Sequence, residues 1–424
     1  MSMLAPFTIA RPRLSLPATT AYAAAAAITF AATAAAPTPL YRLYQEAFGL
    51  TAFEITLIFA TYAVSIVASF LTLGRLSDHV GRRPMILAAL LLNAAALLGF
   101  ISATGVVSLI AARFVQGFGT GIALTTLGAT IADTDPKNAP TLNGVTAFAG
   151  LTLGALIAGL LVSYAPMPRQ LVYAVLLAAS LAEIALLAVV PETTARRPGA
   201  WSVLVPRLSV PTAARAAMLR LTPLNVASWA LGGFYLSLMP SLVAAATGTR
   251  SVLIGAAVVT ALMLTGTIVV VALRQVAADR LVRLGAGGLG LGVAVTFASV
   301  QAQSAAGMFI GTVVAGVGFG AAYAGNLRTL LPLAGPDERA RLLAAYFVAS
   351  YTSFALPAVI AGLIAPRFGL VATSTGYGVV LVLLTLASIV AELWQGSRRP
   401  AEAPAVVPVV ALAAETEEAS CAAE

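Results

Sequence analysis

Several charged residues lie inside long apolar runs of this sequence, where a charge is costly. Glu54 and Glu183 are acidic, and Arg113 and Arg328 are basic. A carboxyl group in apolar surroundings readily holds a proton, and a buried guanidinium needs a partner or a task. Groups of this kind suit the carrying of protons and the binding of polar or charged solutes.

Residue types that most enzymatic reactions need are scarce. His79 is the only histidine and Cys421 is the only cysteine of the 424 residues. A histidine-based metal site, a catalytic triad and an intrachain disulfide are therefore not expected. No phosphate-binding sequence of the form G-x-x-x-x-G-K-[ST] occurs, which argues against ATP as an energy source. We predict a protein that is not an enzyme, with no catalytic residues, no metal and no cofactor.

The composition is that of an integral membrane protein. The mean hydropathy is +0.95, and only 9% of the residues are charged, against roughly 25% in soluble domains. Spanning a bilayer takes about 20 apolar residues. We predict an all-α, polytopic protein whose twelve transmembrane helices lie at 19–40, 52–73, 84–104, 106–132, 142–164, 171–191, 221–246, 251–273, 284–301, 306–331, 342–365 and 371–394.

The basic residues predict which side each loop faces. Most arginines fall in alternate loops, and only Arg42, Arg169, Arg250 and Arg367 fall in the others. Because Lys and Arg are retained on the cytoplasmic side, we expect both termini in the cytoplasm and the protein in the plasma (inner) membrane. The net charge of +8 then reflects topology, and no nucleic-acid partner is expected.

An internal repeat divides the chain. The segment GFGTG at 117–121 reappears as GVGFG at 316–320, and AGL at 158–160 reappears at 361–363. Such repeats place a substrate site between the two halves, near the bilayer midplane. We expect a cytoplasmic N-terminal segment 1–18, six-helix halves 19–191 and 221–394, a cytoplasmic linker 192–220 with a short interfacial helix at 209–219, and a disordered tail 395–424.

Two motifs resemble those of a known family. The loop GRLSDHVGRR at 74–83 is similar to the signature G-x-L-x-D-x-x-G-R-R of the major facilitator superfamily of secondary transporters. The segment RFVQGFG at 113–119 resembles the R-x-x-Q-G-x-G pattern of that family. The resemblance implies a twelve-helix bundle that alternates between inward-open and outward-open states and carries a small molecule. We expect it to work as a monomer.

The resemblance also implies a gate. The gating residues are Gly74, Asp78, Gly81, Arg82, Arg83 and Asp133. Asp78 is expected at the start of the eleventh helix near residue 342, and Arg82 near Asp133. These contacts would hold the cytoplasmic side shut. Pro191-Glu192-Thr193 is similar to the acidic cap that many members carry after the sixth helix.

The substrate class follows from the polar residues expected in the cavity. They are sparse: Arg113, Gln116, Asn93, Asn225, Tyr235, Asn326 and Tyr346. This favours efflux of an amphiphilic, drug-like compound or secondary metabolite. The glycine-rich segment 150–159 is similar to the antiporter signature of the family, but Ala155 and Ala158 depart from it, so close helix packing explains it equally well. Uptake of a sugar or an organic ion stays open, and a transporter-derived membrane sensor is less favoured.

An ion gradient is the expected energy source. Proton coupling needs a carboxyl group in the membrane, and Glu54 and Glu183 are the candidates. Glu54 is favoured as the first proton carrier because it lies closer to the outer water, whereas Glu183 is expected to be better buried but on a peripheral helix. Proton antiport is the predicted mechanism.

Overall fold

The computed structural model describes residues 13–199, 204, 208–249, 251–335 and 338–396. Every regular element of these residues is helical. The helices are α1 (Leu16–Ala35), α2 (Pro37–Phe48), α3 (Ala52–Leu73), α4 (Ser77–Val80), α5 (Arg82–Ile101), α6 (Val106–Thr134), α7 (Ala139–Tyr164), α8 (Leu171–Leu186), α9 (Thr212–Ser237), α10 (Met239–Thr247), α11 (Val252–Ala272), α12 (Ala278–Gln301), α13 (Ala305–Leu330), the 3-10 helix η2 (Leu331–Leu333), α14 (Arg339–Phe368) and α15 (Leu370–Gly396).

The long helices match the predicted transmembrane segments. Ten described helices are long and apolar enough to cross a membrane, and the bent pair of α9 and α10 makes eleven. Helix α8, with 16 residues, is apolar but shorter. Together these overlap the twelve predicted segments one to one. The all-α, polytopic fold is thereby confirmed, while α8 falls below the usual spanning length.

Two spans are broken at prolines. Helix α1 ends at Ala35 and α2 begins at Pro37. Helix α9 ends at Ser237, and after the single residue Leu238 the helix α10 begins, with Pro240 in its first turn. Proline has no N–H to continue a helical ladder. The second break bends its span by 66°. Both breaks lie at corresponding places in the chain, as an internal repeat requires.

The prediction of a separate interfacial helix at 209–219 was wrong. Residues from Thr212 onward form the first turns of α9, which continues to Ser237 with Pro223 inside it. The alanines, leucines and arginines after Thr212 favour helix, and the backbone of Pro211 is extended just before the helix begins. Residues 1–12 and 397–424, which hold most of the predicted N-terminal segment and tail, lie outside the described residues.

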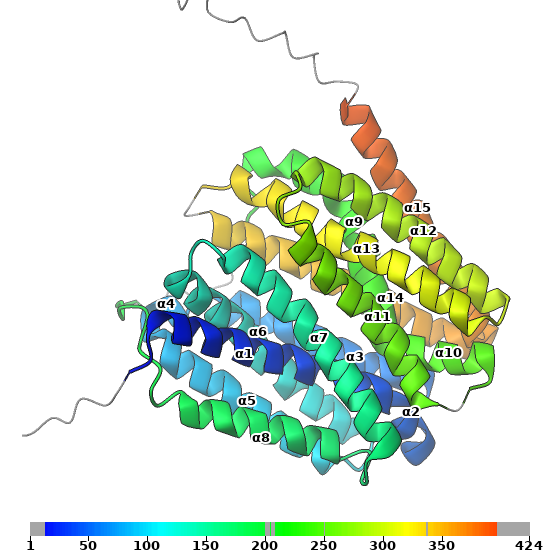
Figure 1. Cartoon of the computed structure of the whole chain (residues 1–424), viewed down its shortest axis with the longest axis horizontal. Coiled ribbons are helices and arrows are strands. Elements are labelled where there is room, and N and C mark those ends of the chain that lie inside the picture. Colours follow the sequence, from blue (N-terminus) through cyan, green and yellow to red (C-terminus); the bar gives the residue numbers. More distant parts are fainter. Residues whose placement is uncertain (1–12, 200–203, 205–207, 250, 336–337, 397–424) are drawn as a thin grey trace, which may run out of the picture.

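The helices pack as two groups (Figure 1). We call α1–α8 the first half and α9–α15 the second half. The motif end is the end of the bundle that carries residues 74–83, and the opposite end carries α2 and α10. The described residues begin at the motif end, where the Leu14 amide donates to the Val189 carbonyl.

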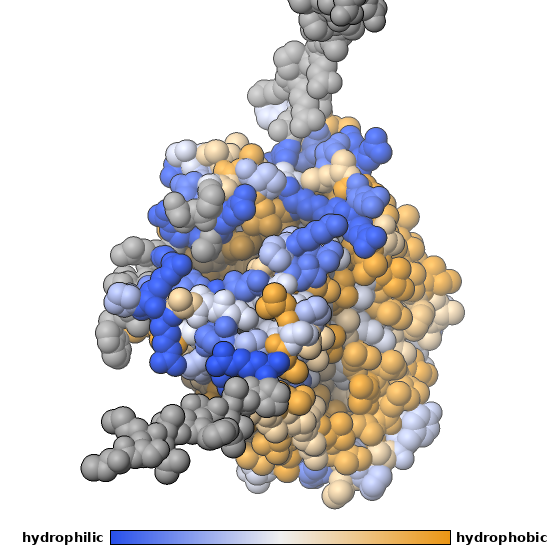
Figure 2. All heavy atoms as spheres, turned by 60° about the vertical axis from the view of Figure 1, so that its left-hand side comes forward, coloured by the Kyte–Doolittle hydropathy of each residue, from blue (hydrophilic) through white to orange (hydrophobic). Residues whose placement is uncertain are grey.

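The surface divides in the same way. Figure 2, in which the motif end is turned toward the viewer, shows hydrophilic residues gathered on that face and hydrophobic residues over the flank. Exposed leucines such as Leu91, Leu98 and Leu383 belong to the helices that surround the bundle. A belt of exposed apolar side chains suits contact with lipid tails.

Candidate functional site

The two halves are joined at the opposite end. The Thr38 hydroxyl donates to the Leu236 carbonyl at 2.8 Å, and Arg42 Nη1 donates to the Thr249 carbonyl at 3.1 Å. Two glycines let helices from different halves touch: a Cβ atom at Gly159 of α7 would collide with the Ala256 Cβ of α11, and one at Gly362 of α14 would lie 2.8 Å from the Thr56 Cγ2 of α3. The opposite end is therefore closed.

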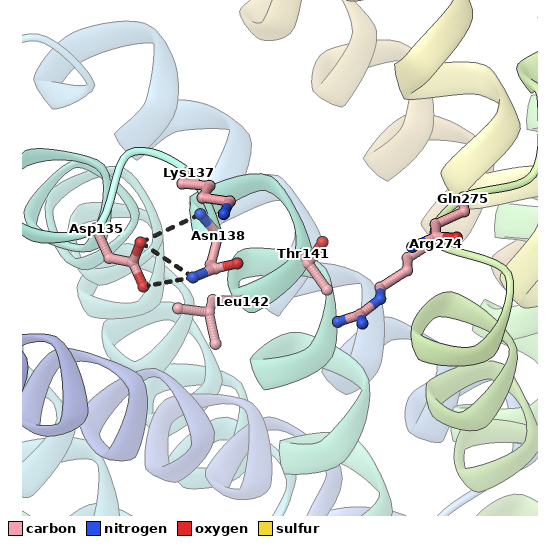
Figure 3. Close-up of a pocket in the computed structure, with 7 residues that line it drawn as sticks. All are labelled: Asp135, Lys137, Asn138, Thr141, Leu142, Arg274 and Gln275. Atoms are coloured by element: carbon pink, nitrogen blue, oxygen red, sulfur yellow. Dashed lines mark hydrogen bonds between the residues drawn. The ribbon is translucent and has the colours of Figure 1, made fainter.

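At the motif end the halves stand apart. A cleft of about 610 Å³ is lined by Asp135, Lys137, Asn138, Thr141 and Leu142 of the first half and by Arg274 and Gln275 of the second. Figure 3 shows Arg274 reaching across from the turn between α11 and α12 toward α7, while Asp135 accepts hydrogen bonds from Asn138. In Figure 2 the motif face is hollowed between its two lobes. Access to the space between the halves is from this end.

Aromatic rings fill the contact between the halves, from the middle of the helices to the last turn of α3 at the motif end. Phe59, Phe70 and Phe148 come from the first half, and Trp229, Phe319, Tyr323, Phe347, Tyr351 and Phe354 from the second. We call these nine residues the aromatic seam. Ring centroids lie 4.7 Å apart for Phe59 and Phe354, 5.7 Å for Phe70 and Phe347, and 5.3 Å for Phe148 and Phe319. A molecule that passes between the halves must part these rings.

Arg113 lies beside the break between α1 and α2, and not in the cleft. Because Pro37 has no N–H, the Thr33 carbonyl is left without its helical donor, and it accepts a hydrogen bond from Gln116 Nε2 at 2.9 Å. Arg113 Nη1 donates to the Ala34 carbonyl at 3.1 Å and to Gln116 Oε1 at 2.7 Å.

The other side of the Arg113 guanidinium is enclosed by rings. Its Nη2 donates to the Tyr41 hydroxyl, and its central carbon lies 5.3 Å from the ring centroid of Tyr62 and 5.8 Å from that of Phe100. The side chain is 1% exposed. Since all these partners belong to the first half, Arg113 and Gln116 hold the broken span in place in this conformation.

The remaining residues predicted for the cavity fall into three places. Asn93 donates to Ser180 at 3.0 Å, which joins α5 to α8 inside the first half. Asn225 bonds Ser350, and Tyr235 bonds Thr312, both inside the second half. Asn326 and Tyr346 are buried there with unpaired polar atoms. None of the seven predicted cavity residues lines the cleft at the motif end.

The structure brings most of the predicted gating residues together. Arg82 donates to Asp78 at 2.6 Å, to Asp133 at 3.0 Å and to Ser77 at 2.6 Å. Arg82 is also the first residue of α5, where free amides attract a carboxylate. That carboxylate is Glu192, which accepts from the amides of Arg82 and Arg83 at 2.7 and 3.2 Å.

Glu192 is a partner of the loop that the sequence did not identify, because 110 residues separate it from Arg82. Gly81 makes room for it: its φ is +109°, and a Cβ there would lie 2.7 Å from Glu192 Oε2. All these contacts lie within the first half. Among the described residues no hydrogen bond or ion pair joins Asp78 to α14, which fits a motif end whose halves are apart.

We expect Asp78→Asn to raise the population that is open at the motif end and to impair transport, with folding intact. In this variant Arg82 keeps its hydrogen bonds to Asp133 and Ser77. The Asp78 carboxylate, however, is no longer available to the N-terminus of α14 when the motif end closes. That interaction is worth about 1 kcal/mol, which is roughly fivefold in the ratio of closed to open molecules. Thiol labelling of a cysteine placed at Thr141, in a Cys421→Ala background, measures the opening. The control is Asp279→Asn, which removes the exposed Asp279–Arg283 pair of the second half. Equal labelling and transport in wild type and Asp78→Asn would refute the gate.

The two candidate proton carriers have different surroundings. Glu54 lies at the start of α3, where its Oε2 accepts from the amide and hydroxyl of Thr51 at 2.7 and 2.9 Å. This is a capping box, which gives Glu54 a structural role at the N-terminus of α3. Glu183 is 8% exposed; its Oε1 accepts from the Thr29 hydroxyl of α1 at 2.6 Å, and its Oε2 has no partner.

Comparison with known proteins gives a consistent result. Residues 21–284 match the family model described as Major Facilitator Superfamily. The human organic anion transporter MFSD10 (TETRAN) has a similar structure, with a TM-score of 0.65 and 16% identity over 89% of this chain and 100% of that one. A variant of the nucleoside transporter NupG is also similar in structure, with a TM-score of 0.64 and 11% identity over 91% of this chain and 100% of that one. No curated protein sequence matches significantly.

Proposed function

Because the chain belongs to the major facilitator superfamily of membrane transporters, we propose that it exports an amphiphilic, drug-like compound or secondary metabolite by proton-coupled alternating access. The observation that carries this proposal is the aromatic seam. Nine aromatic rings packed where a passing molecule must part them favour planar and apolar solutes, since rings stack on rings and shed water when they do so.

Alternating access requires that one end closes as the other opens. The hydrogen bonds at the opposite end and the cleft at the motif end describe a conformation open on one side only. A rocking of one half against the other would break the contacts of Gly159 and Gly362 and bring Asp135 toward Arg274. We place the motif end, and with it both termini, in the cytoplasm of a cell whose plasma membrane holds the protein, since that end carries most of the arginines.

An organic anion is the second candidate substrate, taken up or exported. The cleft carries Lys137 and Arg274 from different halves, and one protein of similar structure is an organic anion transporter. Two cations at the mouth would raise the local concentration of an anion. A sugar is less favoured, because a sugar needs many hydrogen bonds and the seam offers mainly ring faces.

The proposal is tested by a compound screen in vesicles reconstituted with the purified protein. Aromatic amphiphiles, aromatic anions and sugars are added to vesicles with an imposed pH gradient. We expect aromatic neutral compounds to dissipate the gradient. Movement of anions or sugars alone would overturn the assigned substrate class, and transport without proton movement would overturn the coupling.

Glu183→Gln is expected to abolish proton movement that accompanies the substrate, whereas Glu54→Gln leaves it intact. Glu183 is preferred over Glu54 as the carrier because its carboxyl is buried with one oxygen unpaired, between two helices of the first half. Glu54 serves as the matched control: the same change removes only a cap worth about 1 kcal/mol. The measurement is the substrate-induced pH change inside vesicles. If the Glu183→Gln variant moves protons with the substrate as the wild type does, another group carries the proton.

A further inference from the structure

A buried polar pair lies directly behind the aromatic seam in the second half. Asn326 of α13 is 0% exposed, and Tyr346 of α14 is 2% exposed. Neither amide atom of Asn326 has a hydrogen-bond partner, and neither has the Tyr346 hydroxyl. Buried polar groups are nearly always hydrogen-bonded, so a side chain with both its donor and its acceptor unpaired calls for an explanation.

The pair is adjacent to rings of the seam. Tyr346 lies 5.4 Å, centroid to centroid, from Phe347, and its hydroxyl lies near Trp229, Asn326 and Ser350. Trp229 in turn packs 5.0 Å from Tyr351. A planar solute between the rings would reach the pair with one edge.

The surroundings of the pair are uncharged. Arg328, two residues beyond Asn326, is turned away, because its guanidinium donates to the Leu273 and Val276 carbonyls at 3.1 Å each. Arg113 is held by the first half. An ionised ligand group would therefore have no counter-charge here, whereas a neutral group needs none.

The geometry points to Asn326 and Tyr346 as the specificity site for a neutral solute that carries an amide or lactam edge on a planar ring. A carboxamide side chain offers one donor and one acceptor side by side, and the complementary edge is an N–H beside a C=O. Sites that hydrogen-bond a substrate group reject analogues that lack it, since the buried partner is then unpaired. This inference rests on the proposed transport of aromatic molecules and names the polar part of the substrate.

The test uses 2-quinolone and N-methyl-2-quinolone, which are planar, neutral and fluorescent and differ in the single N–H. Binding to the purified full-length protein is measured by fluorescence titration. We expect 2-quinolone to bind about tenfold more tightly. Asn326→Leu should reduce this ratio to about one, and Tyr346→Phe should reduce it severalfold. An unchanged ratio in Asn326→Leu would overturn the inference, as would equal binding of the two quinolones, or no binding of either, by the wild type.

Two controls separate recognition from folding. Tyr377→Phe removes a partly buried hydroxyl of the same half that donates to the Ala230 carbonyl at 2.7 Å, and it should leave the ratio at about ten. Asn326→Leu should melt no lower than the wild type without ligand, because the buried amide that it removes makes no hydrogen bond of normal geometry. A large loss of stability would instead mark a structural asparagine and overturn the assignment. The vesicle screen reports the proposed function separately, since substrates found there without an amide preference would overturn only this inference.

Discussion

Gly159→Val and Gly362→Val are expected to abolish transport and to leave the protein open at the opposite end. These two glycines are related by the internal repeat, and each touches the other half: Gly159 of α7 lies against Ala256, and Gly362 of α14 lies against Thr56. A valine at either place fits only if α7 and α11, or α3 and α14, move apart.

The size of the effect follows from overpacking. Extra methyl groups in a close contact cost about 1–3 kcal/mol, and each 1.4 kcal/mol is tenfold in an equilibrium constant. Because the contact exists only while the opposite end is closed, this cost falls on that state and shifts the population by roughly five- to a hundredfold. Folding is spared, since the open state relieves the clash.

Other glycines provide the comparison. Gly154 belongs to the same helix, but a Cβ there would lie 2.6 Å from Ala32 Cα of α1, within the same half. Gly154→Val should therefore reduce the amount of folded protein and not trap a conformation. Gly287 of α12 meets nothing within 4 Å, so Gly287→Val should transport nearly as the wild type does.

The measurement is thiol labelling of a cysteine introduced at Thr247, beside the opposite end, in a Cys421→Ala background. Labelling should rise in Gly159→Val and Gly362→Val, and should stay at the wild-type level in Gly287→Val. Normal transport by either of the first two variants would show that these contacts do not open during the cycle.

Arg113→Ala is expected to lower stability and transport together. The change leaves the Ala34 carbonyl and the Tyr41 hydroxyl without their donor and removes a side chain that is 1% exposed. Losing hydrogen bonds from a charged donor and leaving buried acceptors unpaired costs on the order of 3 kcal/mol in the free energy of unfolding. Arg113→Lys should restore little, because a single ammonium cannot reproduce the planar fork.

Melting in detergent and transport per folded molecule separate the two roles of this arginine. We expect a melting temperature several degrees lower for Arg113→Ala than for Arg328→Ala, whose guanidinium is only partly buried and contacts two carbonyls near the motif end. An unchanged melting temperature with lost transport would instead show that Arg113 acts on the substrate, as its motif first indicated.

The sequence by itself determined where the membrane helices lie, but the predicted segments 19–40 and 221–246 run across the breaks that follow Ala35 and Ser237. The predicted segment 52–73 coincides with α3, and 371–394 lies within α15. Hydrophobic length, proline positions and loop charges are local properties, so they can be read from the chain without knowing which helices meet. The signature loop could also be recognised from the sequence, because its glycines and arginines lie within ten consecutive residues.

The tertiary structure alone decided which residues face one another. Gly154 and Gly159 belong to one glycine-rich segment, yet the first packs within a half and the second between halves. Asn93 was expected in the cavity and instead bonds Ser180, and Glu192 joins a loop 110 residues away. The physical reason is that lipid, helix contacts and cavity walls all accept apolar side chains. An apolar pattern therefore locates a membrane helix but does not orient it, and only the packing of helices distant in the chain assigns its faces.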